Sequence, residues 1–307
     1  MPIRSWMFVP GDSERKMAKA PDSGADVVIF DLEDAVAPSA KDNARQMTRA
    51  WLEARLNTGD AAKKSKKDAK TPGPQYWVRI NPLDTRMWQY DVEAILPGKP
   101  DGIVVPKAKG PPQLKRLIKL LYEQESRNGI VPGDTKLLAL VSETARAANN
   151  ISAYGRAKHT TSRLAGLTWG AEDLSAAIGA SRKRDESGVW TDLFRMVRAQ
   201  TLIAAHAAGV AAVDTLHADF RDEEGLKRVA REAYQDGFAG MMAIHPAQVP
   251  IINEAFTPSA EELAEARAIV ELFNANPGVG ALQLDGRMID QPHFAQAKKL
   301  LESVSES

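Results

Sequence analysis

Short, continuously apolar runs recur along the chain, and stretches with helical periodicity separate them. Apolar runs without regular polar alternation are typical of parallel strands that are buried on both faces. The pattern predicts eight such strands: Ser5–Val9, Asp26–Phe30, Tyr76–Ile80, Gly102–Val105, Leu137–Val141, Leu164–Trp169, Ala211–Leu216 and Met241–Ile244.

The segments between these runs place apolar residues on one face of a helix. In Ser39–Leu56, Ala44, Met47 and Trp51 recur at helical spacing, which predicts an amphipathic helix packed against a sheet. The same periodicity predicts helices over Pro112–Ser126, Trp190–Ala208 and Glu223–Gln235.

Eight strand–helix units in about 250 residues match an α/β fold of the TIM type, the (β/α)₈ barrel. A doubly wound open sheet is the competing architecture, and the number of units favours the barrel. After Pro258 the pattern changes to two helices, Glu261–Phe273 and Pro292–Val304, separated by a break that reads NANPGVG. We therefore predict a barrel domain over residues 1–257 and a C-terminal helical arm or lid over 258–307. The Lys-, Gly- and Pro-rich segment Asn57–Gln75 predicts a long surface loop.

The amino-acid composition excludes several classes of binding partner and of catalytic or metal site. The 307 residues include 40 Lys and Arg and 40 Asp and Glu, so zero net charge gives no field that favours nucleic acid or a membrane surface. The absence of cysteine excludes disulfides, thiolate metal sites and thiol nucleophiles. With no signal peptide and no apolar run of the roughly 20 residues that a membrane helix needs, we expect a cytoplasmic protein.

Acidic residues follow most of the predicted strands, where barrel enzymes place their chemistry. So many carboxylates facing one another repel unless a cation lies among them, and oxygen ligands favour Mg²⁺, with Mn²⁺ as the alternative. The same residues also act as helix N-caps in many proteins, a reading that stays open for Asp12, Asp34 and Glu172. The acids are Asp31, Glu33, Asp34, Glu143, Glu172, Asp173 and Asp214.

Four of the residues at the strand ends carry more specific candidate chemistry. Glu143 and Asp173 follow adjacent strands, so they are placed to share one ion. Arg79 lies in an apolar strand and needs an anion, either a substrate carboxylate or a structural acid. His245 ends the eighth strand as a base or as a residue that fixes a loop. No dinucleotide, P-loop or serine-hydrolase motif is present, so these chemistries have no support.

Seven motifs in order resemble one family over nearly the whole chain: RSWMFVPG at the start, DLEDAV at 31–36, RIN at 79–81, VVPKA at 104–108, SETA at 142–145, LTWGAEDL at 167–174 and AIHPAQ at 243–248. Together they resemble the citrate lyase β-subunit-like branch of the HpcH/HpaI aldolase superfamily, which includes the malyl-CoA and citramalyl-CoA lyases.

The resemblance implies a Mg²⁺ ion between Glu143 and Asp173, and Arg79 as the residue that steadies the substrate's oxygens. A DG-x-MID element near the C-terminus implies that Asp290 is the catalytic acid/base, delivered by the arm of a neighbouring subunit in a trimer or hexamer. The family implies that further residues hold the metal's waters or the substrate, and we assign these to Asp31, Glu33, Asp34, Lys107 and Arg4.

The implied activity is Mg²⁺-dependent retro-Claisen cleavage of a 3-hydroxyacyl-CoA, such as citramalyl-CoA or malyl-CoA, to pyruvate or glyoxylate and acetyl-CoA or a similar thioester. A citrate lyase β subunit acting on a carrier-bound thioester, a CoA-independent class II pyruvate aldolase and a non-catalytic barrel are the alternatives. One departure is Met241, where the family often has Lys, which predicts altered CoA or acyl binding.

Overall fold

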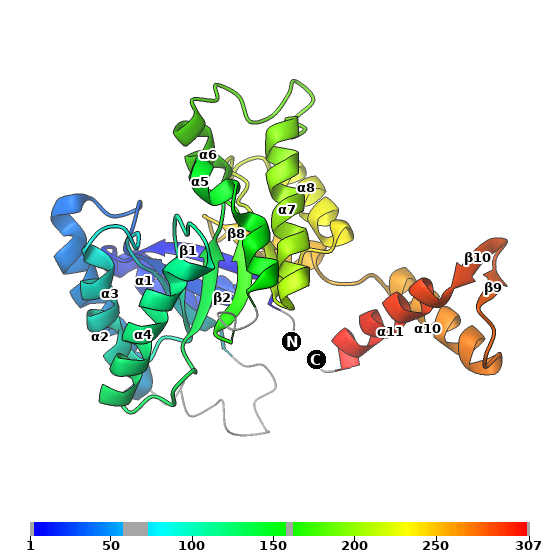
Figure 1. The fold of residues 1–307 in the computed structure, drawn as a ribbon, viewed down its shortest axis with the longest axis horizontal. Helices are drawn as coiled ribbons and strands as arrows, with labels where there is room; N and C mark the ends of the chain where they lie inside the picture. The colour runs from blue at the N-terminus through cyan, green and yellow to red at the C-terminus, as the bar shows by residue number, and fades with distance from the viewer. Residues whose placement is uncertain (1–2, 58–72, 158–161, 306–307) are drawn as a thin grey trace.

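Eight strands of the protein form a closed barrel with helices around it (Figure 1). The computed structural model describes residues 3–57, 73–157 and 162–305. Most of the predicted loop Asn57–Gln75 therefore lies outside the described residues. The barrel strands are β1 (Ser5–Pro10), β2 (Val27–Asp31), β3 (Gln75–Arg79), β4 (Gly102–Val105), β5 (Lys136–Leu140), β6 (Leu164–Thr168), β7 (Ala211–Asp214) and β8 (Gly240–Ala243).

All neighbouring barrel strands are parallel, and their order around the barrel follows the chain. The circle closes where β1 pairs with β8, with Ser5 opposite Met241. This closure confirms the predicted (β/α)₈ barrel and excludes the doubly wound open sheet. The predicted strand ends agree with the observed ones to within two residues.

Helices occupy the connections and turn their apolar faces toward the strands. Helix α8 buries Leu226, Val229 and Ala233, and the Asp222 side chain caps its start by accepting from the Gly225 amide. The α-helices that surround the barrel are α1 (Glu14–Lys19), α2 (Lys41–Asn57), α3 (Met87–Ile95), α4 (Pro111–Arg127), α5 (Ala145–Ala148), α6 (Ala171–Ile178), α7 (Asp192–Ala208), α8 (Glu223–Asp236) and α9 (Gln248–Ala255). Short 3₁₀ helices are η1 (Ala20–Ser23), η2 (Pro38–Ala40), η4 (Leu96–Gly98) and η5 (Ile151–Arg156). None of the described helices combines the length and apolar character needed to cross a bilayer.

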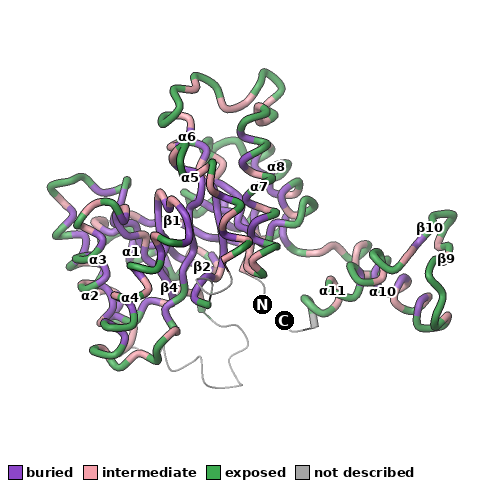
Figure 2. The backbone as a smooth tube through the Cα atoms, viewed as in Figure 1, coloured by how far each residue is buried: buried purple, intermediate pink, exposed green. Residues whose placement is uncertain are grey.

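Two tryptophans fill the interior of the barrel. Trp6 of β1 and Trp77 of β3 meet edge to face, with ring centres 5.1 Å apart. Gly102 of β4 leaves room for them, because a Cβ there would lie 2.5 Å from the Trp77 ring. The strands form the buried centre of Figure 2. Since side chains fill this interior, the barrel has no pore, and polar chemistry is confined to its ends.

The alternation of side chains along two strands places a pair of charges at one mouth. Ile29 of β2 and Trp77 of β3 belong to the cluster inside the barrel. Side chains two residues further along a strand point the same way, so Asp31 and Arg79 also turn inward, where both strands end.

The C-terminal residues form an arm that extends away from the barrel (Figure 1). Helices α10 (Ala260–Ala275) and α11 (Gln291–Ser305) flank an antiparallel hairpin of β9 (Ala281–Leu284) and β10 (Arg287–Asp290). The arm has a small apolar core of its own. An ion pair of 2.5 Å between Arg231 of α8 and Glu262 of α10 ties its base to the barrel.

The two predicted arm helices are present, but the hairpin between them was not predicted. Its strands carry a weak apolar alternation of four residues each, and most of their side chains are exposed or half-buried. The division into domains at residues 257 and 258 stays a prediction.

We predict that Arg163→Met destabilises the barrel by roughly 3–5 kcal/mol, because it strands a buried carboxylate without its partner. Arg163 donates to both oxygens of Glu125 at 2.6 Å, and both side chains are buried. Urea unfolding of the variant measures the loss. The double variant Arg163→Met, Glu125→Gln removes the stranded charge and should recover more than half of it. A single variant as stable as wild type would contradict this account.

Candidate active site

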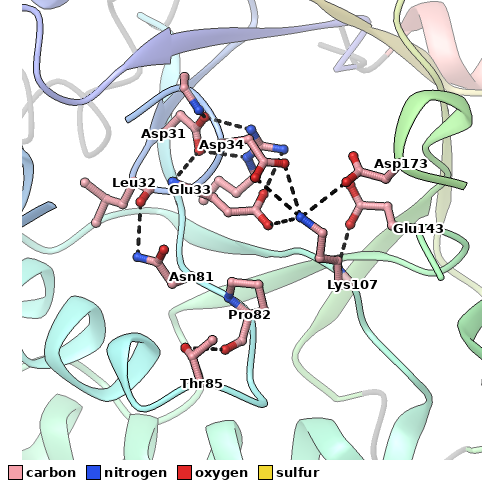
Figure 3. A network of polar contacts seen from close by, with 12 residues as sticks. Asp31, Leu32, Glu33, Asp34, Asn81, Pro82, Thr85, Lys107, Glu143 and Asp173 are labelled. Atoms are coloured by element: carbon pink, nitrogen blue, oxygen red, sulfur yellow. Dashed lines mark hydrogen bonds and ion pairs between the residues drawn. The ribbon is translucent and has the colours of Figure 1, made fainter. Parts of the chain in front are cut away.

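A ring of acidic side chains gathers at the mouth where the strands end (Figure 3). In a parallel barrel all strands end at one rim, so residues far apart in the sequence meet there. We call these residues the carboxylate ring. They are Asp31, Glu33, Asp34, Glu143 and Asp173.

A bidentate ion pair joins Asp31 of β2 to Arg79 of β3, which lie opposite each other in register. Arg79 Nε and Nη2 donate to the two Asp31 carboxylate oxygens, at 2.7 Å each. Burial raises the pKa of Asp31, but the Arg79 charge and hydrogen bonds outweigh it and hold that pKa below its ordinary value. The structural salt bridge considered for Arg79 is therefore present, and its role toward a substrate stays a prediction.

Two polar residues that the sequence did not single out hold the turn that carries Glu33 and Asp34. Lys41 Nζ donates to the carbonyl oxygens of Leu32 and Glu33, at 2.7 and 2.6 Å. The buried Asn81 donates from Nδ2 to the same Leu32 oxygen at 3.1 Å. Asn81 lies in the RIN motif, but no pattern in the sequence indicates what this side chain contacts.

Lys107 follows β4 and reaches into the middle of the ring (Figure 3). Its ammonium lies 2.6 Å from Glu33 Oε1, 3.2 Å from Asp34 Oδ2 and 3.3 Å from Asp173 Oδ1. Its backbone amide donates to Glu143 Oε2 at 2.5 Å. Burial lowers the pKa of Lys107, but these carboxylates, Glu33 first, outweigh it and raise the pKa above its ordinary value. The side chain therefore carries a positive charge into the ring.

Glu143 is buried, and its environment opposes ionisation. Burial, and then the negative charge of Glu33, raises its pKa to about 8. Burial likewise raises the pKa of Glu33 to about 7, against the opposing charge of Arg79. Gly170 makes room for Glu143, since a Cβ on Gly170 would lie 2.9 Å from Glu143 Cγ. The protein thus encloses a carboxylate whose charged form needs another cation nearby.

The residues of the ring fit a hard divalent cation. Five carboxylates share two cationic side chains, Arg79 and Lys107, so the ring carries excess negative charge. In the parts of the chain that the structure describes, no three acidic or histidine side chains are already gathered as a metal site. A Mg²⁺ site does not need three, because this ion is usually held by one or two carboxylates together with water and substrate oxygens. Glu143 and Asp173 are the two best placed to serve.

A pocket of about 320 Å³ opens beside the same mouth. Phe8, Pro10 and His245 from the ends of β1 and β8 form part of its wall. Helix α1 adds basic side chains, which suit phosphate groups. These are Arg15, Lys16 and Lys19. The sequence analysis missed this basic wall, although the three residues lie at helical spacing directly after the first strand.

The sequence was compared with protein families and with known proteins. The profile of the HpcH/HpaI aldolase/citrate lyase family matches residues 4–246. The chain belongs to this family. A citrate lyase subunit beta-like protein of Mycobacterium tuberculosis is 34% identical over 302 residues, covering 98% of this chain and 96% of the relative. A mitochondrial citramalyl-CoA lyase of Mus musculus is 30% identical, covering 98% and 86%, and a (3S)-malyl-CoA thioesterase of Cereibacter sphaeroides is 33% identical, covering 98% and 94%.

The solved structures agree with this assignment. CitE of Mycobacterium tuberculosis in complex with magnesium, acetoacetate and coenzyme A has a TM-score of 0.76 and 34% identity, covering 98% of this chain and 97% of that chain. The family predicted from the seven motifs is confirmed, and so is the class of enzyme, a lyase.

Two of the acids predicted at the strand ends, Asp214 and Glu172, and the family departure Met241 lie away from the carboxylate ring. Asp214 accepts from Trp169 Nε1 at 2.6 Å and from Arg198 at 2.9 Å, so it supports the end of β6. Glu172 pairs with Lys183. Met241 is buried in the layer between strands and helices, and is not among the residues that line the pocket.

The structure places Arg4, one of the site residues predicted from the sequence, away from the carboxylate ring. It precedes β1, and its guanidinium pairs with Asp26, which precedes β2, at 3.1 Å. Residues that precede parallel strands lie at the opposite end of the barrel from the ring. Arg4 therefore joins the starts of β1 and β2, at the end of the barrel opposite the mouth.

Asp290 lies at the end of β10 in the arm, so its own chain does not bring it to the ring. Its carboxylate is 2.5 Å from His293 Nδ1, at the start of α11. The predicted catalytic role of Asp290 is untested by this geometry. Any such role requires the arm of another copy, or a large movement of the arm.

We predict that Glu143 makes the metal-free protein less stable as the pH rises. The unfolded carboxyl ionises near 4.5 and the folded one near 8, so ionisation between these values favours the unfolded state. In a chelating buffer, Glu143→Gln should become more stable than wild type across this window, by on the order of 3 kcal/mol at its upper end.

Urea unfolding at several pH values measures this difference. Asp84→Asn is the matched control, because Lys109 holds the pKa of the exposed Asp84 below its ordinary value, so its contribution has the opposite sign. A difference between Glu143→Gln and wild type that does not change with pH would show that Glu143 titrates normally.

Proposed function

We propose that this protein is a Mg²⁺-dependent CoA-ester lyase that cleaves a 3-hydroxyacyl-CoA, citramalyl-CoA or malyl-CoA, to a 2-oxo acid and acetyl-CoA or a similar thioester. The observation that carries the proposal is the carboxylate ring, with Arg79 at its edge and a basic pocket beside it. The 34% identical CitE structure, described with magnesium, acetoacetate and coenzyme A, supports the same ligand classes.

Glu143 and Asp173 are the residues that would hold the ion, which is Mg²⁺ or, as the alternative, Mn²⁺. When bound, the ion would supply a Lewis acid for the hydroxyl and carboxylate oxygens of the substrate. The remaining acids of the ring would hold its water ligands. The negative ring offsets the ion's charge, and burial of Glu143 strengthens that attraction.

Arg79 positions the 2-oxo acid portion of the substrate. Asp31 fixes the guanidinium from one side, and the Phe8 ring lies 4.6 Å from its Cζ atom. A preorganised guanidinium stabilises negative charge that develops on substrate oxygens without having to reorient during the reaction. Arg15, Lys16 and Lys19 then bind the phosphates of CoA in the neighbouring pocket.

Asp290 handles the proton. Cleavage turns the substrate hydroxyl into a carbonyl, and the hydroxyl proton is released to solvent. Breaking the carbon–carbon bond leaves an electron pair on the α-carbon of the thioester, Asp290 donates a proton to that carbon, and Asp290 then regains a proton from solvent. In the condensing direction it removes the same proton. Since the arm of one chain lies apart from its own ring, we propose a homo-oligomer, a trimer or hexamer, in which a neighbour's arm closes each site.

Hydrolysis of the thioester is a second candidate activity. The relatives from Cereibacter sphaeroides named (3S)-malyl-CoA thioesterase, at 33% identity over 98% of this chain, favour it. The CoA-independent aldolase fits less well, because it leaves the basic pocket without a role.

We predict that the purified protein with Mg²⁺ releases pyruvate from citramalyl-CoA or glyoxylate from malyl-CoA, and that EDTA abolishes the release. Both stereoisomers are offered separately, and 2-oxo acid and free CoA are measured in parallel. Free CoA without 2-oxo acid would identify hydrolysis instead. If no thioester reacts, the CoA-ester lyase proposal is wrong and the aldolase is tested with pyruvate donors.

Asp290→Asn should lower kcat by at least about 100-fold, which is the lower limit of what a positioned general acid contributes. Mg²⁺ affinity, measured by calorimetry, should not change, because Asp290 is not one of the two residues proposed to hold the ion, Glu143 and Asp173. Asp285→Asn, in the exposed turn of the same hairpin, is the matched control and should keep normal turnover. A normal kcat for Asp290→Asn would remove this residue from the mechanism.

A further inference from the structure

The backbone of Lys107 has an uncommon conformation. Its φ is +50°, in the left-handed region that non-glycine residues rarely occupy, and it shares this among described residues only with Lys99 and Asp285. Lys99 ends a 3₁₀ helix and Asp285 lies in a hairpin turn, so chain reversal accounts for both. Strained conformations of this kind persist where the surrounding contacts hold them, often at functional sites.

In this left-handed conformation both the backbone amide and the side chain of Lys107 contact acids of the ring. The Lys107 amide donates to Glu143 Oε2 at 2.5 Å, while the side chain reaches the opposite acids and places Nζ 2.6 Å from Glu33 Oε1. In Figure 3 the ammonium lies between the Glu33 and Asp34 side on one hand and Asp173 on the other. Backbone and side chain of Lys107 thus contact both predicted metal ligands, Glu143 and Asp173.

The ammonium and a metal ion would compete for Asp173. A bridging ammonium screens the repulsion between carboxylates, as a metal does, but with half the charge and no preferred coordination geometry. Its contact with Asp173, at 3.3 Å, is the longest of the three, whereas the contact with Glu33 is short. The flexible stem of lysine allows the first contact to break while the second remains.

We propose that Lys107 is a built-in cation of the metal site. Its ammonium holds the carboxylate ring together before the ion binds and gives up Asp173 when it does, while its amide keeps Glu143 in place. This inference rests on the proposed metal site. It makes Lys107 a positioning residue that sets how tightly the ion is held.

Calorimetric titration of the metal-free protein with Mg²⁺ tests the inference without substrate. Lys107→Met removes the competing charge from the ring, so its Kd for Mg²⁺ should fall at least about tenfold below that of wild type. Without Mg²⁺, its thermal midpoint should drop, because the carboxylates lose their counter-charge. The midpoint shift on adding Mg²⁺ should exceed that of wild type.

Two further variants separate charge from backbone. Lys107→Asn tolerates the left-handed conformation and is too short to reach the ring, so it should match Lys107→Met in Mg²⁺ affinity and covers the case in which that variant does not fold. Lys109→Met removes a nearby lysine that pairs with Asp84, at 2.6 Å, and should bind Mg²⁺ within about twofold of wild type.

Two outcomes would overturn the inference. One is Mg²⁺ affinity that is unchanged or weaker in Lys107→Met and Lys107→Asn. The other, measured on wild type, is a crystal structure with Mg²⁺ in which Lys107 Nζ still lies within 3.5 Å of Asp173. If wild type itself binds no Mg²⁺, the proposed metal site fails instead, and the variants are not needed to establish that.

Discussion

Repulsion among the five carboxylates of the ring is the constraint that the rest of the active-site end depends on. Like charges in a buried setting are costly. Burial, and then the negative charges beside them, raise the pKa values of Glu33 and Glu143 above their ordinary values. Arg79 neutralises one side of the ring, Lys107 the middle, and the remaining negative charge is what gives the site its affinity for a cation. A ring whose negative charge was fully neutralised by Arg79 and Lys107 would not attract a further cation.

The barrel supplies these compensations through register. Asp31 and Arg79 are opposite each other because β2 and β3 pair in the order that closes the barrel, and both turn inward because of the two-residue alternation that places Ile29 and Trp77 in the core. The interior below them is filled, which keeps water from reaching the ion pair from beneath. Fold and charge are therefore coupled, since a shift of one residue in either strand would separate the pair and turn one charge toward the helices.

The barrel and most residues of the carboxylate ring could be predicted from the sequence. Unbroken apolar runs located all eight strands, and a parallel barrel then required their polar C-terminal neighbours to meet. This argument holds only for polar residues that follow a strand. Arg4 precedes β1, so it lies at the end of the barrel opposite the mouth. The hairpin of the arm has strands too short and too exposed for a clear pattern. The left-handed backbone of Lys107 could not be predicted from the sequence either. Its cause is the set of contacts that Lys107 makes with the acids around it, and these contacts are known only from the structure.

The proposed proton donor lies on the C-terminal arm and not on the barrel. In the proposed mechanism the barrel supplies the metal ligands, a guanidinium and a phosphate-binding wall, and the proton for the α-carbon comes from the arm. Asp290 is carried on a unit with its own core, joined to the barrel near Arg231 and Glu262. If Asp290 is the donor, as proposed, a separate unit would let the mouth open for a substrate as large as an acyl-CoA and exclude water once the arm closes. On this reasoning the proton donor and the closing element are one structure, so loss of the arm should remove proton transfer and solvent exclusion together while leaving the carboxylate ring intact.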